Sequence, residues 1–118
     1  MSSNLFDMTN KVALITGSSK GIGRAIAEEM VRQGAKVVIS SRKADVCQEV
    51  ADAINAEAKA SGNQTGEAIV IPAHVGQREA LQHLVDETRA RLGQIDVLVC
   101  NAAAVSYTHL RAHETYDH

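Results

Sequence analysis

Four short apolar runs, rich in β-branched residues, alternate along the chain with longer segments of mixed polarity. The runs cover residues 11–16, 36–41, 67–73 and 95–100. Runs of this length that are apolar throughout are typical of strands buried on both faces of a sheet. Pro72 falls near the end of the third run, where a missing N–H disturbs a strand least. The pattern therefore predicts four buried strands.

The three segments between these runs carry apolar residues at helical spacing. Gly34, Gly62 and Gly93 follow the segments, as is common after the C-termini of helices. The pattern predicts three helices, whose apolar faces are formed by Ile22, Ala25, Ile26, Met30 and Val31 in the first, Val46, Val50, Ala53 and Ile54 in the second, and Leu81, Leu84, Val85 and Leu92 in the third.

The alternation of strands with helices determines the expected fold. Connections of this length are too long for hairpins, so they predict right-handed crossovers and a parallel sheet. We expect an α/β fold of the Rossmann type, a doubly wound parallel sheet in the order 3-2-1-4 with helices on both faces, truncated after the fourth strand. Residues 1–104 would form a partial dinucleotide-binding domain. The fourth strand would remain an unpaired edge, which makes the fold marginal.

A glycine-rich turn at residues 16–23 links the first predicted strand to the first helix, with the sequence Thr-Gly-Ser-Ser-Lys-Gly-Ile-Gly. Gly17 can adopt a backbone conformation closed to other residues, Gly21 lets the main chain approach a pyrophosphate, and Gly23 permits close helix–strand packing. The first helical turn would offer its free N–H groups and positive dipole end to phosphate. A glycine-rich turn without a ligand is the simpler alternative.

The residues after the second strand bear on the choice of dinucleotide. An acidic residue there would bind the ribose 2′-hydroxyl of NAD, whereas arginine accommodates the 2′-phosphate of NADP. This chain has Ser41, Arg42 and Lys43 at that place, and Lys20 adds charge from the glycine turn. The residues therefore favour NADP over NAD. The alternative is that Arg42 and Lys43 are solvated loop residues.

Composition and charge narrow the class of protein. The formal net charge is −2, which gives no electrostatic reason to expect nucleic acid or an anionic membrane as partner. Cys47 and Cys100 match no metal-ligand or redox spacing, so we expect reduced thiols in a cytoplasmic protein. Residues 1–10 lack the basic and apolar segments of a signal peptide, and nowhere do 18 apolar residues run together, so we expect neither secretion nor membrane spanning.

Two segments, taken in order, resemble the short-chain dehydrogenase/reductase family. The first is the T-G-x-x-x-G-x-G spacing at residues 16–23. The second, residues 95–103, resembles the family's fourth strand and the N-A-G-type turn after it. Ala103 stands where glycine is usual and Cys100 where a first asparagine is common. The resemblance runs from Lys11 to about residue 104, and is nearest to the branch of NADPH-dependent carbonyl or retinal reductases.

The resemblance implies roles for several residues. Asn101 would stabilise the central sheet, Asp96 would support the fourth strand, and Ala102 and Ala103 would line the adenosine ribose. His74 and Val75 fall where the family usually has an aspartate against adenine; a histidine could bond to or stack on adenine, or be an ordinary loop residue. The cofactor-binding set is then Gly17, Ser19, Lys20, Gly21, Ile22, Gly23, Ser41, Arg42, His74, Val75, Asn101, Ala102 and Ala103.

By the same resemblance, the full-length parent would transfer hydride between NADP(H) and a small carbonyl or alcohol substrate, as a homo-oligomer. The family's catalytic tyrosine, lysine and serine lie beyond the fourth strand, in a region that this chain lacks. Tyr107 and Arg111 do not reproduce that pattern, so no catalytic residue is assigned and the chain alone is expected to be inactive. The alternative is a stand-alone nucleotide-binding or regulatory module.

The character of the chain changes over residues 105–118, which hold both tyrosines and three of the five histidines. The segment does not continue the family pattern and resembles translated sequencing adapter, so we expect a non-native or disordered tail. His109 and His113 could share a helix face and bind zinc with His118 or Glu114. No rigid supporting groups are evident for such a site, so no metal is predicted.

Overall fold

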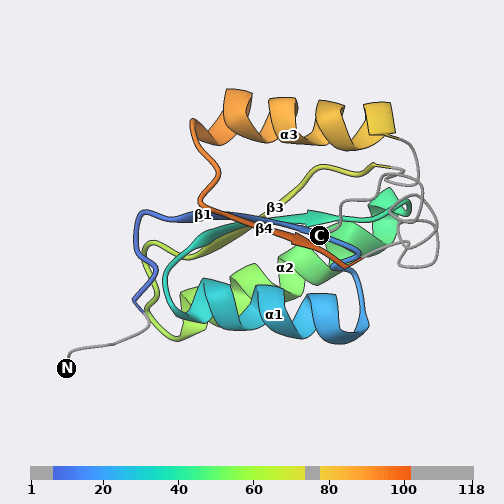
Figure 1. Cartoon of the computed structure of the whole chain (residues 1–118). Helices are drawn as coiled ribbons and strands as arrows, with labels where there is room; N and C mark the ends of the chain where they lie inside the picture. The colour runs from blue at the N-terminus through green and yellow to red at the C-terminus, as the bar shows by residue number, and fades with distance from the viewer. Residues whose placement is uncertain (1–6, 74–77, 102–118) are drawn as a thin grey trace.

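The computed structural model of the chain describes residues 7–73 and 78–101. Strands and helices alternate strictly along these residues (Figure 1). The order is β1 (Val12–Thr16), α1 (Gly21–Arg32), β2 (Lys36–Ser40), α2 (Ala44–Ala60), β3 (Glu67–Val70), α3 (Arg78–Leu92) and β4 (Val97–Cys100).

The four strands form one parallel sheet in the order β3-β2-β1-β4, which confirms the predicted topology. In the register, Leu14 of β1 pairs with Val38 of β2 on one side and with Leu98 of β4 on the other. Each connection therefore crosses over a face of the sheet and returns its strand parallel to the one before. All carboxyl ends of the strands consequently lie along one edge of the sheet.

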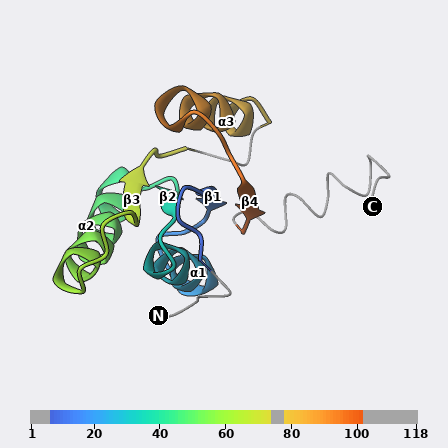
Figure 2. The same ribbon diagram turned by 90° about the vertical axis from the view of Figure 1, so that its left-hand side faces the viewer.

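Helices cover both faces of the sheet, with α1 and α2 on one face and α3 on the other (Figures 1 and 2). Alternate side chains of β1 pack on opposite faces of the sheet. Ala13 and Ile15 belong to the larger core cluster under α1 and α2. Leu14 packs with Val38 and Leu84 beneath α3. Every residue of β1 is buried, as expected for an apolar run in a strand covered on both faces.

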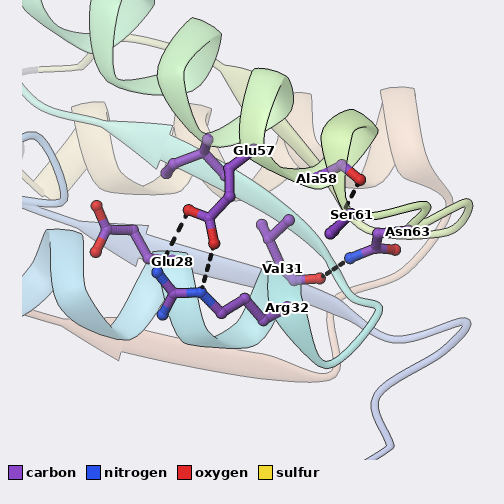
Figure 3. Close-up of a pocket in the computed structure, with 8 residues that line it drawn as sticks. Glu28, Val31, Arg32, Glu57, Ala58, Ser61 and Asn63 are labelled. Atoms are coloured by element: carbon purple, nitrogen blue, oxygen red, sulfur yellow. Dashed lines mark hydrogen bonds and ion pairs between the residues drawn. The ribbon is translucent and has the colours of Figure 1, made fainter.

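The contact between α1 and α2 combines apolar packing with polar bonds at its rim (Figure 3). Arg32 Nε lies 2.8 Å from Glu57 Oε2, and Asn63 Nδ2 donates to the Val31 carbonyl at 2.7 Å, which satisfies one carbonyl in the last turn of α1. The ion pair is half exposed, so solvent screens it and it contributes little to stability. The groove here has a volume of about 10 Å³, room for about one water molecule. Burial of Val31 and of Ile54 therefore holds this layer together.

The apolar face of α1 agrees with the prediction at Ile26, Met30 and Val31, which pack in or against the core, and differs from it elsewhere. Gly23, Ala27 and Val31 are its buried residues, whereas Ile22 is 72% exposed. Ala25 is exposed as well. Because residues 23 and 27 are small, the helix can lie close to the sheet. The face that carries Gly23, Ala27 and Val31 is therefore buried, and Ile22 is not.

The predicted third strand extended to Ala73, but β3 ends at Val70. The chain nevertheless continues alongside β2 for three more residues. The Ile71 N–H donates to the Ile39 carbonyl at 3.2 Å, and the Ala73 N–H donates to the Ser41 carbonyl at 3.0 Å. Pro72 lies between these two donors, where its missing N–H costs no ladder bond.

The strand β4 is the outer strand of the described sheet and pairs with β1 alone. Its Leu98 is 48% exposed, although its register partner Leu14 is fully buried. Cys100 at the strand's end is exposed, Cys47 in α2 is buried, and both thiols are free, as predicted. No helix among the described residues is long and apolar enough to span a membrane.

We predict that Leu84→Ala lowers the free energy of unfolding by about 2–5 kcal/mol, the usual range for a fully buried leucine. Leu84 is the fully buried apolar residue of α3 and packs with Leu14 and Val38. Leu98→Ala is the matched control, because half of that side chain is already in water, and should cost less than half as much. Urea unfolding followed by circular dichroism measures both. Equal losses would contradict the assignment of α3 to the core.

Candidate functional site

The glycine turn leaves the carboxyl end of β1 and enters α1 within four residues, Gly17 to Lys20. Gly17 has φ 64° and Gly21 has φ 63°, a left-handed conformation that side chains other than glycine rarely adopt. A Cβ added to Gly21 would meet nothing within 4 Å, so its surroundings are open. The turn therefore has the conformation predicted for Gly17, and main chain is accessible at Gly21.

The first turn of α1 is open to an anion. Lys20 is the N-cap residue, and its side chain makes no capping hydrogen bond. No acidic residue occupies the first turn of the helix either. The N–H groups at this end are therefore not capped by a side chain, and the positive end of the helix dipole is not neutralised there. Such an end can accept a phosphate in front of Gly21.

Gly23 is needed for close packing, though its neighbours differ from the predicted ones. An added Cβ would overlap the Gly17 carbonyl oxygen and lie 2.8 Å from Asn101 Nδ2. The sequence predicted that Gly23 permits close packing of the first helix against a strand. In the structure the helix instead packs against the carbonyl of the turn that precedes it and against the residue that follows β4.

Ser18 has a part in the site that the sequence alone did not indicate. Its side chain is fully buried, and its hydroxyl donates to the Ile15 carbonyl at 2.7 Å and accepts from the Ser40 N–H at 2.8 Å. The Ser18 N–H in turn donates to the Ser40 carbonyl at 3.1 Å. The turn is thus bonded to the tip of β2. Two adjacent serines in the motif gave no signal for which of them was buried.

Asn101 and Thr16 connect the turn to the end of β4. The Asn101 N–H donates to Thr16 Oγ1 at 2.9 Å, and Asn101 Nδ2 donates to the Gly17 carbonyl at 3.3 Å. These bonds are consistent with the stabilising part that the resemblance implies for Asn101. The ends of β1, β2 and β4 are therefore all linked through the glycine turn.

Asp96 links β4 to β1 at the other end of β4, just before the strand begins. Its Oδ2 accepts from the Val12 N–H at 2.8 Å and from Gln94 Nε2 at 2.6 Å, and its own N–H donates to the Val12 carbonyl. The bond from Val12 is the largest cause that lowers the pKa of Asp96 below its ordinary 3.8, with Gln94 and the charge of Lys11 adding to it. Asp96 thus fixes the start of β4 beside β1, as expected.

The basic residues proposed for phosphate binding lie on the loops at the same edge of the sheet. Lys20 and Arg42 are exposed, and neither forms an ion pair with any residue in the described ranges. Ser41 is held in place, because its Oγ lies 3.1 Å from Cys47 Sγ and accepts from the Lys43 N–H at 3.2 Å. The loop after β2 is therefore anchored at Ser41, while the guanidinium of Arg42 remains accessible to solvent.

The remaining predicted site residues fall into two groups. Ser19 is half-buried and Ile22 is exposed beside the open turn. His74, Val75, Ala102 and Ala103 lie outside the described residues, as do His109 and His113 of the zinc alternative. Within residues 7–73 and 78–101 there is no cluster of three or more potential metal ligands. The described part of the site therefore consists of main chain, serines, Ile22, Asn101 and two cations.

We predict that Gly23→Ala is more destabilising than Gly21→Ala. Alanine is the better helix former by about 1 kcal/mol, but at position 23 its Cβ overlaps a backbone carbonyl that no rotamer change can move. At position 21 the cost is only that of a positive φ, about 1–2 kcal/mol, because the space is open. Thermal or urea unfolding of both variants measures the order. A Gly23→Ala protein as stable as the wild type would contradict the packing.

We also predict that Asp96→Asn flattens the acid limb of the stability curve. A carboxyl whose folded-state pKa is depressed stabilises the fold above its unfolded pKa, near 3.8, and loses this contribution as the pH falls. Asparagine cannot titrate, so the free energy of unfolding of the variant should fall less between about pH 5 and pH 2. Glu49→Gln, at an exposed position of α2, is the control. Identical slopes for Asp96→Asn and the wild type would contradict this assignment.

Comparison with known proteins identifies the family. The model of a family described as short chain dehydrogenase matches residues 11–117, a range that runs past the predicted boundary at residue 104. A probable tetrahydroxynaphthalene reductase of Zymoseptoria tritici is 38% identical over 113 residues, which cover 93% of this chain and 40% of the relative.

Solved structures agree with this match. A short-chain type dehydrogenase/reductase from Mycobacterium marinum has a TM-score of 0.73 and 39% identity over 83% of this chain and 37% of its own. A Pseudomonas aeruginosa RhlG complex with NADP has a TM-score of 0.71 and 31% identity over 82% of this chain and 36% of its own. The chain thus spans about two fifths of the length of these relatives. Sequence motifs, sheet order and the match over residues 11–117 agree that the chain belongs to the short-chain dehydrogenase family.

Proposed function

We propose that this chain binds NADP(H) and is the cofactor-binding portion of an oxidoreductase. In the full-length parent, hydride would pass between NADP(H) and a carbonyl or alcohol substrate, with the nicotinamide supplying the hydride chemistry when bound. The name of the Zymoseptoria tritici relative supports a reductase. The narrower proposal is the carbonyl or retinal reductase branch, on the resemblance of the loops after β2 and β3.

The observation that carries this proposal is the open glycine turn at the carboxyl ends of β1 and β2. Its main chain is accessible at Gly21, and the helix end beyond it lacks a side-chain cap. In open parallel sheets, ligands bind outside the carboxyl ends of the strands. The residues present therefore fit a dinucleotide, whose pyrophosphate would be held by the main chain near Gly21 and by the first-turn N–H groups of α1.

The side chains around the turn support NADP rather than NAD. Ser41, Arg42 and Lys43 follow β2, where an NAD-binding chain would place an acidic residue against the ribose. Arg42 and Lys20 are free to bind a 2′-phosphate without first breaking an ion pair to a described residue. The Pseudomonas aeruginosa relative solved as an NADP complex is consistent with this choice.

Further residues complete the proposed cofactor site. Ser19 and Ile22 lie in the turn beside Gly21, and Asn101 lies where the end of β4 meets it. His74, Val75, Ala102 and Ala103 are proposed to contact the adenosine part, on the family resemblance alone. None of these groups is assigned as a proton donor. Because hydride transfer to a carbonyl also needs such a donor, we propose that this chain binds the dinucleotide without turnover.

We predict that Arg42→Ala weakens NADPH binding at least about tenfold and changes NADH binding less than about twofold, since only NADPH carries the 2′-phosphate. Fluorescence titration of the two reduced dinucleotides gives both dissociation constants. Lys59→Ala is the control, because Lys59 is an exposed cation in the last turn of α2 and has no part in the proposed site. Wild-type protein that binds NADH as tightly as NADPH would overturn the proposed cofactor. An equal effect of both substitutions would overturn the assignment to Arg42.

A further inference from the structure

Ser18 is a buried hydroxyl at a place where the chain leaves the sheet. The register between β1 and β2 ends with the pair Thr16 and Ser40. Beyond it, one chain enters the glycine turn and the other enters the loop to α2. Ser18 bonds to the main chain on both sides of this separation, through its hydroxyl and its N–H.

The two main-chain segments joined in this way each carry one of the proposed phosphate-binding cations. Lys20 is two residues after Ser18 in the turn, and Arg42 is two residues after Ser40 in the loop. Side chains as long as lysine and arginine direct a charge reliably only when the main chain that carries them is fixed. Ser18 is the side chain that fixes one of these segments to the other.

Ser40 is the natural comparison for the hydroxyl at position 18. Its side chain is also fully buried, yet Ser40 Oγ has no hydrogen-bond partner within residues 7–73 and 78–101. A buried hydroxyl without a partner costs free energy, so a serine at this edge does not by itself stabilise the fold. The bonds of Ser18, in contrast, have a defined geometric effect, which is to hold the turn against the tip of β2.

We propose that Ser18 is a positioning residue for dinucleotide selection: its hydroxyl holds the glycine turn to the tip of β2, so that Lys20 and Arg42 act on the same 2′-phosphate. This inference rests on the proposed function, because it concerns the NADP preference assigned to the same site. Ser18 itself need not touch the dinucleotide. Its effect passes through the main chain of Ser40 and through the turn.

The test is the ratio of NADH to NADPH dissociation constants, measured by fluorescence titration for the wild type, Ser18→Ala and two controls. Ser40→Ala removes the neighbouring buried hydroxyl, which has no partner in the described part of the chain. Thr88→Ala removes an equally buried hydroxyl that donates to the Leu84 carbonyl at 2.8 Å, in α3. We expect the ratio to fall at least about fivefold in Ser18→Ala and to stay within about twofold of the wild type in both controls.

Because the readout is a ratio, a variant that is merely less stable leaves it unchanged. A Ser18→Ala protein that keeps the wild-type ratio would overturn the positioning role and leave the proposed NADP function standing. A wild type without NADPH preference would overturn the proposed cofactor, and this inference with it. If Ser18→Ala does not fold, Ser18→Cys replaces it, because the thiol has a similar size but forms weaker hydrogen bonds. An unchanged ratio in that variant would equally overturn the proposal.

Discussion

The close approach of α1 to the turn that precedes it is the constraint on which the candidate site depends. A side chain at position 23 would overlap the carbonyl of Gly17, so only glycine lets the helix begin this near the end of β1. Gly17 and Gly21 supply the positive φ angles that make so short a turn possible. Because the helix starts there, its free N–H groups lie beside the carboxyl ends of the strands. A larger residue at position 23 would move the helix end away from that edge.

The hydrogen bonds around the glycine turn fix the relative positions of the strand ends more than they stabilise the fold. A single neutral hydrogen bond contributes about 1 kcal/mol net. The ion pair of Arg32 with Glu57 is exposed, so solvent screens it. Apolar burial in the two clusters on either face of the sheet outweighs both. Ser18, Thr16 and Asn101 matter because each of their bonds joins segments distant in sequence. Together they bring three strand ends to one place, from which side chains can act on one ligand.

Periodicity in the sequence predicted the fold well because it records burial directly. All four strands and three helices occur where the apolar runs and helical spacing placed them, in the order 3-2-1-4. Boundaries were less predictable, as β3 shows, because hydrogen bonds beside Pro72 depend on the register of β2. The apolar face of α1 was wrong at Ile22, since close packing at Gly23 and Ala27 decides which stripe is buried. Helical spacing alone does not show whether a face with small residues or a face with a large residue packs against the sheet.

The site was predictable where the chain conformation demands a residue type, and less so where a contact depends on the fold. Glycine is the residue that the backbone angles at 17 and 21 favour, so those positions could be read from the sequence. Ser18 could not be separated from Ser19, because which hydroxyl faces the tip of β2 follows from the twist of the chain as it leaves β1. For Arg42 the decisive observation is also structural. Both arginines of α1 are engaged with carboxylates, Arg24 with Glu28 and Arg32 with Glu57, whereas Arg42 has no such partner in the described ranges. An arginine without a partner at the strand ends can bind a phosphate without first giving up an ion pair, and this distinguishes its position from those on the helix.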